Sequence, residues 1–121
     1  MIDINAWMDE ALTELEYPRS EEPIREQVPP EQPYITWLQG KKKETKASGV
    51  TRFIYHEVHV YLWIPDGYQW NGLMTRIAEA LIDAGALKCA MQGMSYIPEI
   101  QRKMVQLNMS IREDVERGRA V

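Results

Sequence analysis

Residues 32–66 read QPYITWLQGKKKETKASGVTRFIYHEVHVYLWIPD, and this stretch decides the fold. Residues 32–38 alternate like a short first strand, and residues 52–64 alternate like an unusually long second strand. The lysine-rich residues 40–51 lie between them and are predicted to form a basic, projecting loop. At about 3.3 Å per residue the second strand spans roughly 43 Å, which is longer than a small domain needs. One end of the hairpin is therefore expected to extend beyond the core.

The two faces of the second strand differ in chemistry. Its even positions from Ile54 to Ile64 are aliphatic apart from His56, which predicts a core face. Its odd positions are Phe53, Tyr55, Glu57, His59, Tyr61 and Trp63. Because this odd face is aromatic rather than charged, we expect it to be covered in part. Aromatic side chains left at the rim of a sheet are typical of subunit interfaces.

The segments on either side complete an α-β-β-α-β-β order. Apolar residues at helical spacing predict one helix from Ile4 to Leu15 and a second from Trp70 through Asp83. Residues 87–97 and 105–112 predict two further strands. The predicted fold class is α+β, an antiparallel four-stranded sheet with both helices packed on one face.

The connecting and terminal segments are predicted to lack regular structure. Residues 17–32 contain four prolines among charged residues, which predicts an extended linker laid along the surface. Residues 116–121 are charged and are expected to fray. At 121 residues the whole chain, 1–121, is predicted to be a single domain.

The net charge of −4 hides a strong asymmetry. Residues 1–33 carry nine acids and two arginines, whereas residues 40–52 carry five bases and one acid. A basic loop on an acidic chain fits phosphate or an acidic patch on a second copy of the protein. The acidic total argues against general nucleic-acid binding, which needs a broad basic face.

Composition and termini favour a protein made in a cytoplasm. The chain is 45% apolar and 26% charged, which is typical of soluble globular proteins, and no apolar run is long enough to span a membrane. Acids near the N-terminus, including Asp3 and Asp9, are unlike a signal peptide. The single cysteine, Cys89, excludes an intrachain disulfide.

The sequence offers no catalytic, cofactor or metal site. His56 and His59 are three residues apart on a strand, so they point to opposite faces and cannot share a metal ion. Gly93-Met94-Ser95 lacks the second glycine of a nucleophile elbow. Gly40-Lys41-Lys42 lacks the first glycine and the hydroxyl residue of a phosphate loop. We therefore expect no enzyme activity and no cofactor.

The candidate functional residues form an assembly interface instead. They are Lys41, Lys42, Lys43, Lys46, Arg52, Tyr55, Glu57, Tyr61 and Trp63. The lysines are expected to meet acidic residues on a neighbouring copy or on another protein, or to face DNA. The alternative is that the lysine run is a solvated loop tip.

This order of features resembles the tail terminator, or neck and tail-completion, proteins of tailed bacteriophages. The resemblance lies in the N-terminal helix, the proline-rich approach, Pro33-Tyr34-Ile35-Thr36-Trp37 as first strand, the charged loop, the long aromatic strand, the second helix and a final strand pair. It implies an α/β sandwich whose subunits form a ring, commonly a hexamer, in the virion neck after assembly in the host cytoplasm.

The resemblance also implies partners and roles. The ring caps the tail tube protein and joins it to the head-tail connector protein, so DNA passes through it. Residues 40–51 would project along or into the ring, and residues 52–64 would supply part of the subunit contact. Two alternatives stay open: a head-closure or connector component of a phage neck, and a small ferredoxin-like binding module.

Overall fold

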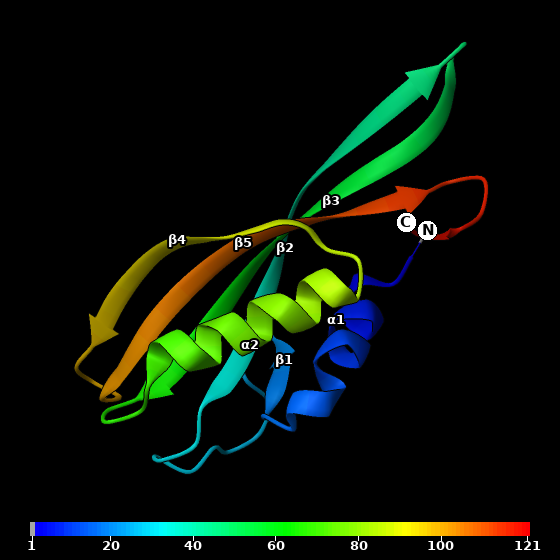
Figure 1. Cartoon of the computed structure of the whole chain (residues 1–121). Helices are drawn as coiled ribbons and strands as arrows, with labels where there is room; N and C mark the ends of the chain where they lie inside the picture. The colour runs from blue at the N-terminus through cyan, green and yellow to red at the C-terminus, as the bar shows by residue number, and fades with distance from the viewer. Residues whose placement is uncertain (1) are drawn as a thin grey trace.

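A computed structural model describes residues 2–121, which form two α-helices and six strands (Figure 1). The helical segments are α1 (Ile4–Leu12), a 3₁₀ turn η1 (Thr13–Leu15) and α2 (Trp70–Asp83). The strands are β1 (Arg19–Glu21), β2 (Tyr34–Ala47), β3 (Val50–Pro65), β4 (Leu87–Ile97), β5 (Arg102–Asp114) and β6 (Arg119–Ala120).

All six strands belong to one sheet, in the order β1-β2-β3-β5-β4 with β6 paired to the end of β5. β1 runs parallel to β2, and the other pairs are antiparallel. The predicted four-stranded antiparallel sheet is therefore wrong. The chain is mostly β, with 49% strand and 21% helix, and its sheet is mixed, six-stranded and curled.

The parallel strand arises inside the segment predicted to be linker. The Ile35 N–H donates to the Pro18 carbonyl and the Glu22 N–H donates to the Trp37 carbonyl, each at 2.9 Å. These bonds hold the three residues of β1 beside β2. An edge position suits this segment because the prolines that flank β1 lack an N–H to donate. The rest of the proline-rich segment contains no strand.

The C-terminal residues also pair with the sheet. After β5 the chain turns, with the Gly118 N–H donating to the Asp114 carbonyl at 2.8 Å. The Val121 N–H then donates to the Arg112 carbonyl at 2.8 Å, beside the paired residues of β6. The prediction that residues 116–121 fray is therefore wrong.

Both helices cover one face of the sheet, as Figure 1 shows. Their buried residues repeat every three or four positions, which places them on one side of each helix. These residues are Ile4, Met8 and Leu12 of α1 and Leu73, Ile77 and Leu81 of α2. They pack on the even positions of β3 and the odd positions of β5. Each buried aliphatic side chain contributes about 1.5–3 kcal/mol, and the predicted core face of residues 52–64 is confirmed.

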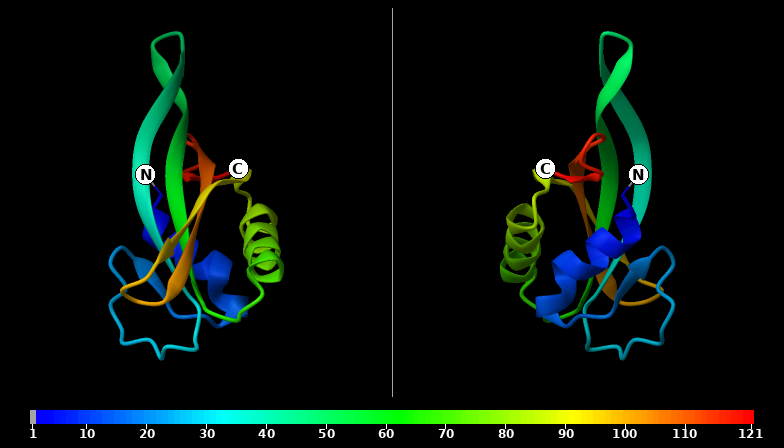
Figure 2. Two further views of the ribbon diagram at one scale, coloured as in Figure 1. Left: turned by 90° about the vertical axis from the view of Figure 1, so that its left-hand side faces the viewer. Right: turned by 90° about the vertical axis from the view of Figure 1, so that its right-hand side faces the viewer.

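The lysine-rich segment is not a loop. β2 continues through Ala47 and β3 begins at Val50, so the turn contains only Ser48 and Gly49. Their φ angles of 54° and 78° suit a type I′ turn, which matches the twist of an antiparallel pair. The hairpin of residues 40–53 is called the arm below; its β2 strand extends past β1, and residues 50–52 of β3 extend past β5. Figures 1 and 2 show the arm projecting away from both helices.

The proline-rich linker lies along the sheet face opposite the helices, called the open face, and Arg102 holds it there. The Arg102 side chain is buried and donates to the carbonyls of Gln32 at 2.7 Å, Pro29 at 2.9 Å and Trp63 at 3.3 Å. Its guanidinium also lies 4.8 Å from the centre of the Tyr34 ring. These contacts hold the chain around Pro29 and Gln32 against the sheet.

Replacing Arg102 with methionine should release this linker. Arg102→Met leaves several carbonyl groups without a donor, and we expect a loss of about 2–3 kcal/mol in the free energy of unfolding. Urea unfolding measures that loss, and hydrogen exchange should show faster exchange across residues 22–33. Arg25→Met is the matched control, because Arg25 lies exposed in the same linker. Equal stability and equal exchange in the two variants would contradict the role of Arg102.

Candidate assembly interface

The arm carries positive charge on both of its sides. Its basic residues are Lys41, Lys42, Lys43, Lys46 and Arg52, and after Glu44 is counted the arm has a charge of +4. All four lysines are exposed. Lys42 lies opposite His56, on the helix side of the sheet, whereas Lys43 lies opposite Tyr55, on the side of the open face. A partner can therefore meet lysines from either side of the arm.

Arg52 has a different role from the lysines. Its guanidinium lies 3.6 Å from the Glu116 carboxylate, and its carbonyl accepts from the Val115 N–H at 3.1 Å. Both charged side chains are largely exposed, so the ion pair contributes at most about 1 kcal/mol. These contacts tie the arm to the turn after β5.

The four remaining candidate residues are half-buried on the open face, but they have different neighbours. Trp63 stacks on Tyr34 with ring centres 5.7 Å apart, and its indole N–H donates to the Thr36 hydroxyl at 2.8 Å. That hydroxyl donates to the Glu22 carboxylate, so the linker holds this end of the face. Trp63 therefore contributes to the linker contact.

Tyr61 and Tyr55 lie on the same face at increasing distance along β3 from that contact. Tyr61 lies opposite Thr36 on β2 and opposite Gln106 on β5. Tyr55 lies opposite Lys43 and Arg112, at the beginning of the arm. Of the aromatic candidates, Tyr55 is thus the one that lies beside the lysines.

Glu57 and His59 form a polar cluster where the arm leaves the sheet. His59 Nδ1 lies 2.8 Å from Asn108 Oδ1, and His59 Nε2 lies 3.4 Å from Glu57 Oε1. The register of β2 shifts beside them, at Gly40 and Lys41. A Cβ atom on Gly40 would lie 2.9 Å from His59 Nε2, so the shift brings the backbone close to the ring. Because both ring nitrogens have polar partners, this cluster fixes the start of the arm.

His56 lies on the opposite face, as the spacing predicted, and is buried. Its Nε2 lies 2.8 Å from Glu113 Oε1, which also accepts from the Ile2 N–H at 3.2 Å. Both side chains are only 2–3% exposed. Burial raises the pKa of Glu113, but the hydrogen bonds from His56 and Ile2, together with nearby positive charge, leave this pKa below its ordinary value. The pair joins β3, β5 and the start of the chain.

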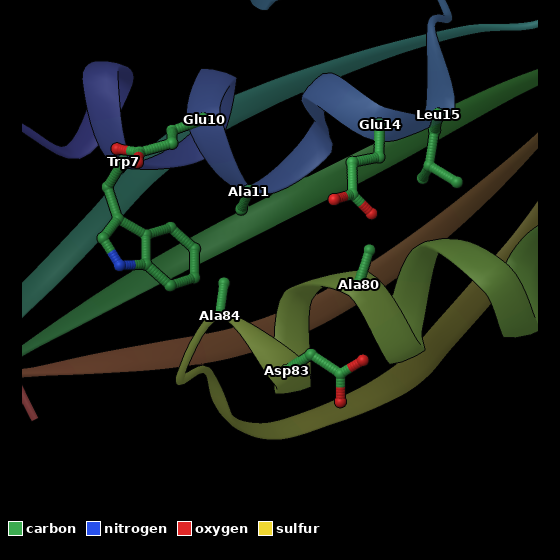
Figure 3. Close-up of a pocket in the computed structure, with 8 residues that line it drawn as sticks. All are labelled: Trp7, Glu10, Ala11, Glu14, Leu15, Ala80, Asp83 and Ala84. Atoms are coloured by element: carbon green, nitrogen blue, oxygen red, sulfur yellow. The ribbon is translucent and has the colours of Figure 1, made fainter.

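A groove of about 440 Å³ separates the two helices (Figure 3). It is lined by Trp7, Glu10, Ala11, Glu14 and Leu15 on the α1 side and by Ala80, Asp83 and Ala84 on the α2 side. The three acids are exposed, and the small alanine side chains leave room between the helices. This groove was not predicted from the sequence.

Neither the metal-ligating side chains of residues 2–121 nor similarity to known proteins points to a function. Within residues 2–121, no group of three or more histidine, cysteine, aspartate or glutamate side chains is arranged to hold a metal ion. None of the helices in that range has the length and the apolar character needed to cross a membrane. The sequence matches no known family model and no curated protein with which it was compared. The arm and the groove are the features on which a function can be argued.

The buried pair predicts how stability depends on pH. Because the folded-state pKa of Glu113 lies below its ordinary value of 4.5, the stabilisation is complete above pH 4.5 and is lost as pH falls through the folded-state pKa. Glu113→Gln should cost about 1–3 kcal/mol at pH 7 and should lose less further stability below pH 4.5 than the parent chain does. Denaturant unfolding from pH 7 to pH 3 measures both effects. Parallel stability curves for the two proteins would contradict the assignment.

Proposed function

We propose that this chain is a structural virion protein, a tail terminator that assembles into a ring on the tail tube of a phage and joins the tail to the head-neck connector. The observation that carries the proposal is the arm, a basic hairpin that extends from the sheet away from the helices (Figure 2). It adds nothing to the core, because residues 38–44 and 46–50 are exposed. An ordered, charged projection of this kind suits contact with another chain.

Ring formation needs two different surfaces on each subunit that complement one another. The basic arm and the acidic surface of the helices meet that need, because they lie on separate parts of the molecule (Figure 1). Opposite charges on the two surfaces accelerate association and fix its register. The same lysines would also face DNA that passes through a central pore.

The ferredoxin-like binding module is the weaker alternative. Such a module would have a four-stranded sheet, whereas this sheet has a parallel strand on one edge and a projecting arm beside it. A head-closure or connector component has the same need for a ring, and only its position in the neck differs. Binding of the purified protein to tail tubes or to connectors separates these two structural roles.

Electron microscopy of the purified protein tests the proposal. We expect rings with a central pore, and we expect the rings to bind to the ends of purified tail tubes. A protein that forms no rings, alone or with tail tubes, would contradict the proposed function. Rings that bind connectors but not tail tubes would favour the head-closure role.

Shortening the arm should abolish the rings and leave the domain folded. Replacing residues 46–52 with Asn-Gly joins Thr45 to Phe53, which already lie opposite each other, through a type I′ turn. The matched control is Ser48→Asn, which introduces the same Asn-Gly turn into an arm of full length. Electron microscopy counts the rings, and circular dichroism confirms folding. Rings from the shortened chain would mean that the tip of the arm takes no part in assembly.

A further inference from the structure

The groove between α1 and α2 has the chemistry of a site for a basic side chain. Glu10 on α1, Glu14 on η1 and Asp83 on α2 line this groove together with alanine methyl groups, and the Trp7 ring lies at one end (Figure 3). An apolar floor accepts the methylene stem of a lysine, carboxylates accept its ammonium group, and an aromatic ring adds a cation–π contact.

The negative charge of this groove is not neutralised within the chain. Across residues 2–121, the carboxylates of Glu10, Glu14 and Asp83 have no ion-pair partner. By contrast, the neighbouring Asp9 pairs with Arg19 at 3.0 Å. Neither α1 nor α2 has a basic residue in its last turn, so the partial negative charge at the carboxyl end of α2 adds to that of the groove.

The tip of the arm matches the groove in shape and charge. The turn residues Ser48 and Gly49 are small, and beside them Val50 is 62% exposed, the highest value among the exposed large apolar side chains. Lys46 lies next to this tip, and Lys43 follows on the side of the open face. A narrow tip with one apolar side chain and nearby lysines complements a groove with an apolar floor and an acidic rim.

The groove of the same molecule is not available to this arm. The arm extends away from the helices in all three views, and its strands are held to the sheet at the Glu57 and His59 cluster (Figures 1 and 2). From these observations we infer that the arm of each subunit docks in the α1–α2 groove of a second copy of the chain. This inference rests on the proposed ring and names the two surfaces that form its subunit contact.

Reversing the charge on one surface at a time tests this contact. The arm-reversed chain carries Lys43→Glu and Lys46→Glu, and the groove-reversed chain carries Glu10→Lys and Glu14→Lys. Each chain alone places like charges in contact, so we expect its self-association to weaken by about tenfold or more. An equimolar mixture should recover assembly, because each arm then meets a groove of opposite charge. Sedimentation velocity measures the association, and native mass spectrometry should find equal numbers of the two chains in each assembly.

Two further chains make the result specific. One carries all four substitutions and should self-associate like the parent chain. The control carries Glu26→Lys and Glu99→Lys, which make the same change in net charge at exposed residues outside the groove. This control should assemble normally and should not rescue the arm-reversed chain. Thermal unfolding of every variant checks that loss of assembly is not loss of folding.

The outcomes separate this inference from the proposed function. Rings that form normally from either reversed chain, or a mixture that fails to recover assembly, would overturn the arm–groove contact and leave the ring proposal standing. Assemblies that follow the charge rules but form open chains without a pore would support the contact and contradict the tail-terminator role. A parent chain that stays monomeric up to about 1 mM would overturn the contact outright.

Discussion

The central strand β3 sets the position of every other element, because it pairs with β2 on one side and β5 on the other along nearly its whole length of 16 residues. Alternation along this strand divides the molecule. Val58, Val60 and Leu62 point to one face and are completely buried beneath the helices. The other face is left for the linker and the polar cluster. Since the same strand continues beyond β5 into the arm, the core that fixes β3 also fixes the direction of the arm.

Much of this could be predicted, because long periodic segments leave a clear signal. The core face of β3, the two helices, β4 and the opposite faces of His56 and His59 were all predicted correctly. β1 and β6 were missed because segments of three and two residues are too short to show any period. They exist because main-chain groups near Pro18 and Val121 find partners that only the folded sheet provides.

The arm was wrongly predicted to be a loop for a different reason. Lysine and glutamate have low strand propensity, so residues 41–46 read as loop. Pairing with residues 51–56 overrides this preference, and the Ser48-Gly49 turn closes the hairpin. The groove could not be predicted at all from local pattern. It depends on which turns of two helices face each other, and no spacing within one helix carries that information.

A purely protective role at the edge of the sheet is the alternative explanation for the lysines of the arm. Lysines on an edge strand prevent the edges of two sheets from joining, and this alone explains some lysines on β2. It does not explain why the strand pair continues beyond its neighbours, since a shorter hairpin would have less edge to protect. The other long edge, β4, is protected in a different way, because two register shifts interrupt its pairing with β5.

The distribution of charge also limits which surfaces two copies of the chain can bring together. A two-fold dimer joined through its arms would place two arms of charge +4 against each other, and a dimer joined through its grooves would place six carboxylates together. Both arrangements are repulsive. A contact between unlike surfaces brings the arm of one chain to the groove of another, and a pair of chains joined by one such contact keeps one free arm and one free groove. Such a contact is made twice in a two-fold dimer, or it repeats from chain to chain until it closes into a ring or continues as a filament.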